Sequence, residues 1–188
     1  MTSSKLDRRK KYTQSVLKDS LMKILKEKQM SSITVKEICE RADINRSTFY
    51  SHYNDQFDLL DKVEDEIIED MTGYLSQFNY KKEEDAIKML EKLLEYFASK
   101  QEICQTLLNE KIDTTFQKKV MKFAKQFFIE SWISDNNVDE DITEYLSIFV
   151  ISGCIHMIRS WLNNRMDKSP KEMAQLINNL INKGLLGV

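Results

Sequence analysis

The sequence contains few of the residues that make tight turns or disulfides. Its 188 residues include one Pro, four Gly and three Cys. A sandwich or barrel of short strands needs many turn-forming residues, so these counts argue against an all-β fold. Cys39, Cys104 and Cys154 lie far apart in segments of periodic apolar residues, as reduced buried thiols do. We therefore expect a helical, cytoplasmic protein.

Groups that carry out catalysis or bind metals are also scarce. Two His and three scattered Cys leave no zinc-binding spacing. A di-iron bundle needs a Glu three residues before each His, but Phe49 and Gly153 stand there before His52 and His156. The sequence has no Gly-rich phosphate loop, no Gly-x-Ser-x-Gly and no His-Glu-x-x-His. It predicts no catalytic residue, no metal and no cofactor, and hence no enzyme.

Neither a secretory signal nor a membrane span is expected. The first residues, MTSSKLDRRKK, are polar and basic. The longest apolar stretch, 145–162, is interrupted by Ser147, Ser152, His156 and Arg159. A bilayer span needs about 20 mostly apolar residues. This stretch is therefore interpreted as a buried core helix.

The net charge of −2 hides an uneven distribution. Residues 1–55 contain 12 Lys and Arg against 7 Asp and Glu, a net charge of +5, and residues 56–188 contain 16 against 23, a net charge of −7. A basic segment before an acidic one suggests that the first meets an anionic partner, although ordinary compositional fluctuation is the alternative. The change in the sign of the charge predicts a domain boundary near residue 55, with one domain over 1–55 and a second over 56–188.

Apolar residues recur at helical spacing along almost the whole chain. The expected fold class is all-α, with three N-terminal helices followed by a helical bundle. Thr34 with Glu37 predicts a capping box, Asn45 predicts an N-cap, and Ser169-Pro170-Lys171-Glu172 predicts a capping box with Pro in the first position. The expected helices cover residues 11–28, 35–42, 46–52, 56–78, 83–99, 101–110, 114–133, 139–165 and 170–183.

Two short helices joined by a tight turn at Asp43-Ile44 follow the first helix. In a helix-turn-helix, the second short helix enters the major groove of DNA. Within 45–53, Phe49 is expected to point inward, and the opposite face carries hydrogen-bonding side chains without a carboxylate. A helix that meets a polyanion should lack Asp and Glu. The alternative is a polar face that meets only solvent.

Residues 33–60, ITVKEICERADINRSTFYSHYNDQFDLL, resemble the DNA-binding domain of the TetR family of bacterial transcription regulators. The resemblance implies a homodimeric regulator of a near-palindromic DNA operator, usually a repressor, whose effector is a small apolar or aromatic molecule. It also assigns DNA contacts to six residues. These are Lys36, Arg46, Ser47, Thr48, Tyr50 and His52.

Two positions depart from the family pattern. Asp43 stands where a turn Gly is usual, so it must adopt an uncommon backbone conformation, which Asp tolerates better than most residues. Gln56 stands where a Lys is usual, and the neighbouring Asp55 adds a charge that repels phosphate. The cluster Arg8–Lys11 either compensates by reaching phosphates or is a solvated helix end.

The segment 139–165 is apolar on two sides, so we expect it to be buried on both. One stripe consists of Ile142, Leu146, Phe149, Gly153 and Met157. We assign the other stripe and the apolar face of the last helix to a two-fold interface between subunits, with a deep monomer core as the alternative. The predicted interface residues are Ile148, Ile151, Ile155, Ile158, Leu162, Met173, Leu176, Ile177 and Leu180.

The TetR resemblance also implies a small-molecule pocket between the fourth and eighth helices. Met and aromatic side chains suit an adaptable apolar cavity, although the same helical spacing fits a simple core. The candidates are Met71, Tyr74, Tyr96, Phe97, Phe123, Phe127, Phe128, Trp132, Phe149 and His156. A ligand-responsive repressor is the main functional hypothesis. The alternative is a TetR-like protein that acts through a protein partner and has no effector.

Overall fold

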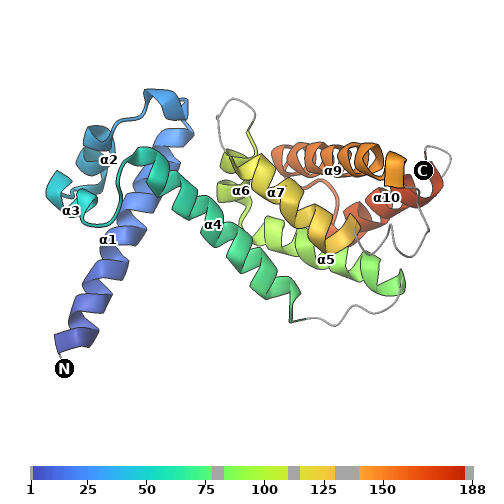
Figure 1. The fold of residues 1–188 in the computed structure, drawn as a ribbon, viewed down its shortest axis with the longest axis horizontal. Helices are drawn as coiled ribbons and strands as arrows, with labels where there is room; N and C mark the ends of the chain where they lie inside the picture. Colours follow the sequence, from blue (N-terminus) through green and yellow to red (C-terminus); the bar gives the residue numbers. More distant parts are fainter. Residues whose placement is uncertain (1, 78–82, 110–114, 130–139, 185–188) are drawn as a thin grey trace. The chain divides into compact units, whose positions relative to one another are not determined.

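The computed structural model describes residues 2–77, 83–109, 115–129 and 140–184. Within these ranges every regular element is helical, and nine of the elements are α-helices. The prediction of an all-α fold is therefore confirmed (Figure 1).

The chain divides into two compact units, which are described separately. The N-terminal unit consists of Met1–Ile67 with Asn109–Thr115, and the C-terminal unit of Ile68–Leu108 with Phe116–Val188. The first division falls inside helix α4 (Gln56–Leu75), because the first turns of α4 bury apolar side chains in the N-terminal unit.

The N-terminal unit has a core to which four helices contribute. Its helices are α1 (Thr2–Leu25), α2 (Val35–Ala42), α3 (Arg46–Tyr50) and the first part of α4, with a 3-10 turn at Met30–Ser32. The core side chains from these helices that are completely buried include Leu17, Leu21, Ile24, Ile38, Phe49 and Leu59. Phe49 is the side chain through which α3 is anchored in this core.

Helix α1 begins at Thr2, well before the predicted start at residue 11. The first buried side chain of the helix among those described is Thr13, and residues 7–12 are exposed. Apolar periodicity marks only the packed part of a helix, so it gave no sign of the polar turns that precede it.

A buried carboxylate connects two distant parts of the N-terminal unit. Glu64 of α4 is completely buried, and its Oε2 accepts a hydrogen bond from Thr115 Oγ1. This bond holds the end of the segment Asn109–Thr115 against α4.

Three of the predicted helix starts are found in the structure. The Thr34 hydroxyl accepts from Glu37 N, and the Asn45 carboxamide oxygen accepts from Ser47 N. The full capping box predicted at Thr34 is wrong in its second half, because the Glu37 carboxylate pairs with Lys28 Nζ at 2.6 Å. The capping box at Ser169 is complete, with Pro170 in the first turn.

The C-terminal unit is a helical bundle. Helices α5 (Glu83–Ser99) and α10 (Pro170–Lys183) pack along each other, and α6 (Gln101–Leu107) and α7 (Phe116–Ala124) both contact α9 (Glu140–Asn163) (Figure 1). A π-helical turn, Lys125–Ile129, follows α7, and the rest of the helix predicted over 114–133 lies outside the described residues.

Candidate DNA-binding interface

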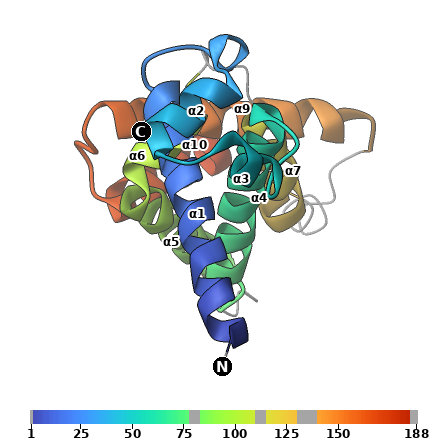
Figure 2. The same cartoon turned by 90° about the vertical axis from the view of Figure 1, so that its left-hand side faces the viewer.

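The turn between α2 and α3 sets the direction of α3. Asp43 adopts φ 54° and ψ 43°, the left-handed conformation that the family's usual Gly would supply. Ile44 N donates to Cys39 O at 3.0 Å and closes the end of α2. The prediction that Asp tolerates this turn is therefore confirmed. Figure 2 shows α2 and α3 with the intervening turn from the side.

The exposed surface of α3 carries hydrogen-bonding groups and no carboxylate. Arg46, Ser47 and Tyr50 are exposed, whereas Thr48 and His52 are half-buried. The ring of buried Phe49 lies edge-on to Tyr50, with centroids 5.6 Å apart, and supports a phenol that is 58% exposed. This surface can donate to phosphate oxygens and base edges without bringing a negative charge close to them.

The charges around α3 favour an anion. Arg46 has no acidic partner in the part of the chain that the structure describes, so its guanidinium can bind phosphate or guanine. Lys36 of α2 is exposed but lies 3.7 Å from the Glu40 carboxylate. Because exposed pairs of this kind contribute little, Lys36 can exchange this partner for phosphate.

The ring of His52 is oriented by its surroundings. Its Nδ1 is buried and has no hydrogen-bond partner among the described residues. Its ring lies next to that of Tyr53, with centroids 6.2 Å apart. The neighbouring Tyr53 is buried, and this burial, with the charges of Glu66 and Asp58, raises its pKa to about 12.

The acidic residue that departs from the family pattern has a structural role. Asp55 Oδ1 accepts hydrogen bonds from Phe57 N at 2.9 Å and from Asp58 N at 2.8 Å, so it caps α4. From the sequence alone, Asp55 is expected only to repel phosphate. The signal that could have revealed the cap was an Asp just before the first apolar residues of a long helix.

The predicted pocket residues do not form one group in the C-terminal unit. Tyr74 and Tyr96 lie together, with ring centroids 6.0 Å apart, and Phe123 stacks on Phe127 at 4.6 Å. Burial raises the pKa of Tyr96 well above its usual value. The members buried in the chain's own core are Met71, Tyr96, Phe97 and Phe123.

Two of the pocket candidates are placed elsewhere. Phe149 is 78% exposed on α9, and His156 is also exposed, with Nδ1 2.7 Å from Ser152 O. Neither joins the buried aromatic side chains, because the helical period turns them to the outer side of α9. Trp132 and the side chain of Phe128 lie outside the described residues.

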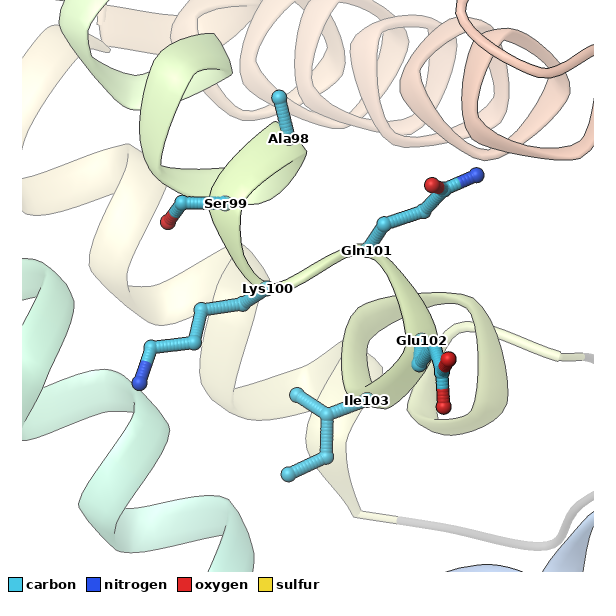
Figure 3. Close-up of a pocket in the computed structure, with 6 residues that line it drawn as sticks. All are labelled: Ala98, Ser99, Lys100, Gln101, Glu102 and Ile103. Atoms are coloured by element: carbon cyan, nitrogen blue, oxygen red, sulfur yellow. The ribbon is translucent and has the colours of Figure 1, made fainter.

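An open hollow of about 440 Å³ lies at the junction of α5 and α6. It is lined by Ala98, Ser99, Lys100, Gln101, Glu102 and Ile103 (Figure 3). None of the pocket candidates named above lines it. Its walls come from one continuous stretch of chain, whereas enclosed ligand sites draw side chains from several elements.

The structure corrects the predicted subunit interface at most of its positions. Six members already pack inside the single chain: Ile151, Ile155, Ile158, Leu162, Met173 and Ile177. Leu176 and Leu180 are half-buried, and Ile148 is 49% exposed. The second stripe of α9 thus faces its own bundle, where the Gln105 side chain also donates to Leu162 O.

The apolar surface that stays exposed is on the other side of α9. It is formed by Ile142, Tyr145, Ile148 and Phe149, which are 46–78% exposed; we call it the α9 apolar face. Asp141–Asn163 is long and apolar enough to cross a bilayer by length and composition alone, and 33% of its most apolar window is buried. Tyr145 is not among the predicted residues of this stripe, although it lies between Ile142 and Phe149 at helical spacing.

Comparison with known proteins agrees with this arrangement. The TetR model for a "transcriptional regulator C-terminal region" matches residues 84–183, more than half of the chain. The HTH-type transcriptional regulator YxbF of Bacillus subtilis, itself uncharacterized, is 38% identical over 55 residues. That match covers 29% of this chain and only 13% of YxbF, so the chain spans a small part of this relative's length.

Solved structures share the fold over almost the whole chain. A TetR transcriptional regulator from Streptococcus agalactiae superposes with a TM-score of 0.71 at 22% identity, covering 95% of this chain and 98% of that chain. FadR of Bacillus subtilis, solved with stearoyl-CoA, gives 0.62 at 15% identity and covers 91% and 98%. With the matching family model and the helix-turn-helix described above, these results show that the chain belongs to the TetR family of DNA-binding transcription regulators.

Proposed function

We propose that this regulator is a homodimeric repressor that binds a near-palindromic operator through the surface of α3. The observation that carries the proposal is the short helix anchored by Phe49, whose exposed side chains are all hydrogen-bonding and uncharged or cationic. Arg46, Ser47 and Thr48 are proposed to face base edges and the nearby backbone. Tyr50, His52 and Lys36 are proposed to bind phosphate.

The α9 apolar face supports the dimer part of this proposal. Large apolar side chains that are exposed together mark interaction sites in soluble proteins, and the commonest partner arrangement is a two-fold pair. We therefore move the proposed interface from the buried stripe to Ile142, Tyr145, Ile148 and Phe149. The two-fold would present two α3 helices about 34–36 Å apart, one turn of B-DNA.

The effector part rests on buried and half-buried side chains of the C-terminal unit, most of them aromatic. Tyr74, Tyr96, Phe97 and Met71 offer an apolar environment with phenol groups for an apolar or aromatic ligand. FadR, which shares the fold, binds stearoyl-CoA. An effector releases DNA only if it binds the non-DNA conformation more tightly, so we propose a population shift that changes the separation of the α3 helices.

Repression is proposed because a dimer that covers an operator would block the access of other proteins to the same DNA. The proposed location is the cytoplasm, where bacterial operators are found. In this proposal the exposed part of α9 is covered by a second subunit, which would explain its apolar composition without a bilayer.

Selection of bound duplexes from a random pool, followed by affinity measurements on the selected site, tests the proposal. Tyr50→Phe should weaken binding by about tenfold, because a hydrogen bond to a charged phosphate contributes roughly 1.5 kcal/mol or more. Thr48→Ala should lose about 1 kcal/mol and relax the sequence preference. Ser76→Ala, which removes one exposed hydroxyl from the C-terminal unit outside the proposed interfaces, is the control. Unaltered binding by both α3 variants would exclude this surface.

A further inference from the structure

The first turns of α1 extend beyond the core of the N-terminal unit. Every described side chain from Asp7 to Tyr12 is exposed, and Tyr12 is 68% exposed. Burial begins only at Thr13. The segment Thr2–Tyr12, here called the basic extension, is about 16 Å of helix at 1.5 Å per residue.

The basic extension is cationic around its whole circumference. Arg8, Arg9, Lys10 and Lys11 are consecutive, so their side chains leave the helix about 100° apart and surround it. Asp7 is the one acid in the segment, and it lies 4.0 Å from Lys11 Nζ in a pair that is exposed on both sides. Exposed pairs of this type contribute little, so the segment keeps a strong positive field.

The charges of the basic extension are not those that stabilise the N-terminus of a helix. No acidic residue occupies the first turn of α1, although one there would stabilise a helix end. A helical segment without packing gains little stability of its own, so the extension depends on continuity with the packed part of α1. Cations spaced around a helix, with no apolar stripe among residues 7–11, suit a polyanion better than a protein groove or a bilayer surface.

The extension and α3 belong to the same compact unit and are on the same side of it. In Figure 1 both lie along the left-hand edge of the N-terminal unit, and in Figure 2 both face the viewer. A duplex that lies against α3 and continues along that side would pass the extension.

We propose that the basic extension is a second DNA-binding surface, which contacts phosphates flanking the base pairs read by α3. The inference rests on the proposed function, since it presumes that α3 binds duplex DNA. Its contacts are to phosphate alone, so they add affinity and salt dependence without adding sequence preference. They also supply positive charge that position 56 lacks, where Gln stands in place of the family's usual Lys.

The test measures affinity for a fluorescent 40-base-pair duplex of random sequence between 50 and 200 mM KCl. The variant R8Q/R9Q/K10Q/K11Q keeps good helix formers and removes four charges. Each lost phosphate contact makes the slope of log K against log[KCl] shallower by about 0.9, so we expect a change of roughly 2–4. The variant and the wild type should rank duplexes selected from a random pool in the same order of affinity.

Two matched variants separate contact from general electrostatics. K118Q/K122Q/K125Q/K171Q removes four exposed lysines from the C-terminal unit, and should leave the slope within about one unit of wild type. R8K/R9K keeps the charge and should keep the wild-type slope. An equal loss of slope in both four-charge variants would overturn the proposal, because it would show a net-charge effect only.

The remaining outcomes distinguish the two proposals. A wild-type protein that binds no duplex at 50 mM KCl contradicts the proposed function. Strong wild-type binding with an unchanged slope in R8Q/R9Q/K10Q/K11Q contradicts only the role of the extension. If the same variant instead loses binding to phosphatidylglycerol-containing vesicles while its duplex slope is unchanged, the partner is a lipid surface and the proposal is wrong.

Discussion

Two exposed helical surfaces of this chain have opposite chemistry. The surface of α3 is polar and free of carboxylates, with Arg46 and Tyr50 in solvent, whereas the α9 apolar face exposes Tyr145 and Phe149 at 75% and 78%. Both helices are held from behind by buried apolar side chains, Phe49 in α3 and Ile155 in α9. The difference therefore lies in what each surface can bind and not in how it is supported.

This difference separates two kinds of binding experimentally. Contacts of α3 with phosphate should weaken steeply with salt, because they release counterions. Association through the α9 apolar face should depend on protein concentration and respond weakly to salt, because the burial of apolar side chains involves no pairing of charges. If the surfaces act independently, a change in one leaves the other measurement unaltered.

The largest effect is expected from Phe49→Ala. Truncation of a buried Phe costs about 3–5 kcal/mol, so α3 should lose its position and DNA binding should disappear. Association of subunits should persist, because α9 belongs to the other compact unit. Urea unfolding measures the loss of stability, and sedimentation velocity measures the association of subunits. Phe57→Ala, at a side chain that is 51% exposed, is the control and should cost less than about 1 kcal/mol. Loss of the dimer in Phe49→Ala would show that the surfaces are coupled.

The next largest effect should come from Phe149→Glu. Burial of a Phe contributes about 1.5–3 kcal/mol, and each substitution occurs twice in a two-fold interface. The dissociation constant of the dimer should therefore rise at least 100-fold. Sedimentation velocity across micromolar concentrations measures this. Gln77→Glu makes the same charge change at an exposed position outside α9 and α10. A dimer as stable as the wild type in Phe149→Glu would place the interface elsewhere.

What could be predicted from the sequence depended on how local the cause was. The N-caps at Asn45 and Ser169 and the left-handed Asp43 follow from a few neighbouring residues, and each prediction is confirmed. The start of α1 was missed because an exposed helical extension has no apolar period to reveal it.

The outward side of α9 could not be chosen from the sequence. Both stripes of the helix are apolar, so periodicity alone cannot tell which side meets α6 and α7. Packing made that choice: Ile151 and Ile158 face the bundle, and Phe149 faces solvent. The assignment of Phe149 to a pocket failed for the same reason, because an aromatic side chain on a helix indicates burial but not against which neighbour.

A moderate effect is expected at the turn that directs α3. Asp43→Val forces a β-branched residue into the left-handed region, which costs about 1–2 kcal/mol. Asp43→Gly should be neutral or slightly stabilising, because Gly adopts φ 54° without strain. Thermal unfolding of the two variants checks the sign of each change. If Asp43→Gly were as destabilised as Asp43→Val, the Asp side chain and not the backbone would matter. Association through α9 should be unaffected in both.

The smallest effect is expected at the start of α10, where a change in the C-terminal unit should leave DNA binding by α3 unaltered. The hydroxyl and backbone N–H of Ser169 donate to the Glu172 carboxylate and hold the pKa of Glu172 below its usual value. A depressed pKa means that this stabilisation is present above the ordinary Glu pKa of about 4.3 and is lost as pH falls through the lower folded value. Glu172→Gln should therefore melt slightly below the wild type at pH 7, and the gap should close under acid conditions.

Thermal melts at pH 7, 5 and 3 measure the gap, and Lys171→Gln, at the neighbouring exposed position, controls for the change of one charge. A gap that stays constant down to pH 3 would assign the effect to helix propensity, because only an ionised carboxylate loses its contribution by protonation. The salt slope of DNA binding should stay at its wild-type value in Glu172→Gln, since the cap belongs to the C-terminal unit and the phosphate contacts are proposed for the N-terminal one. A changed slope would mean that the cap of α10 influences DNA binding by the surface of α3. The two surfaces would then not be independent, even for this small perturbation.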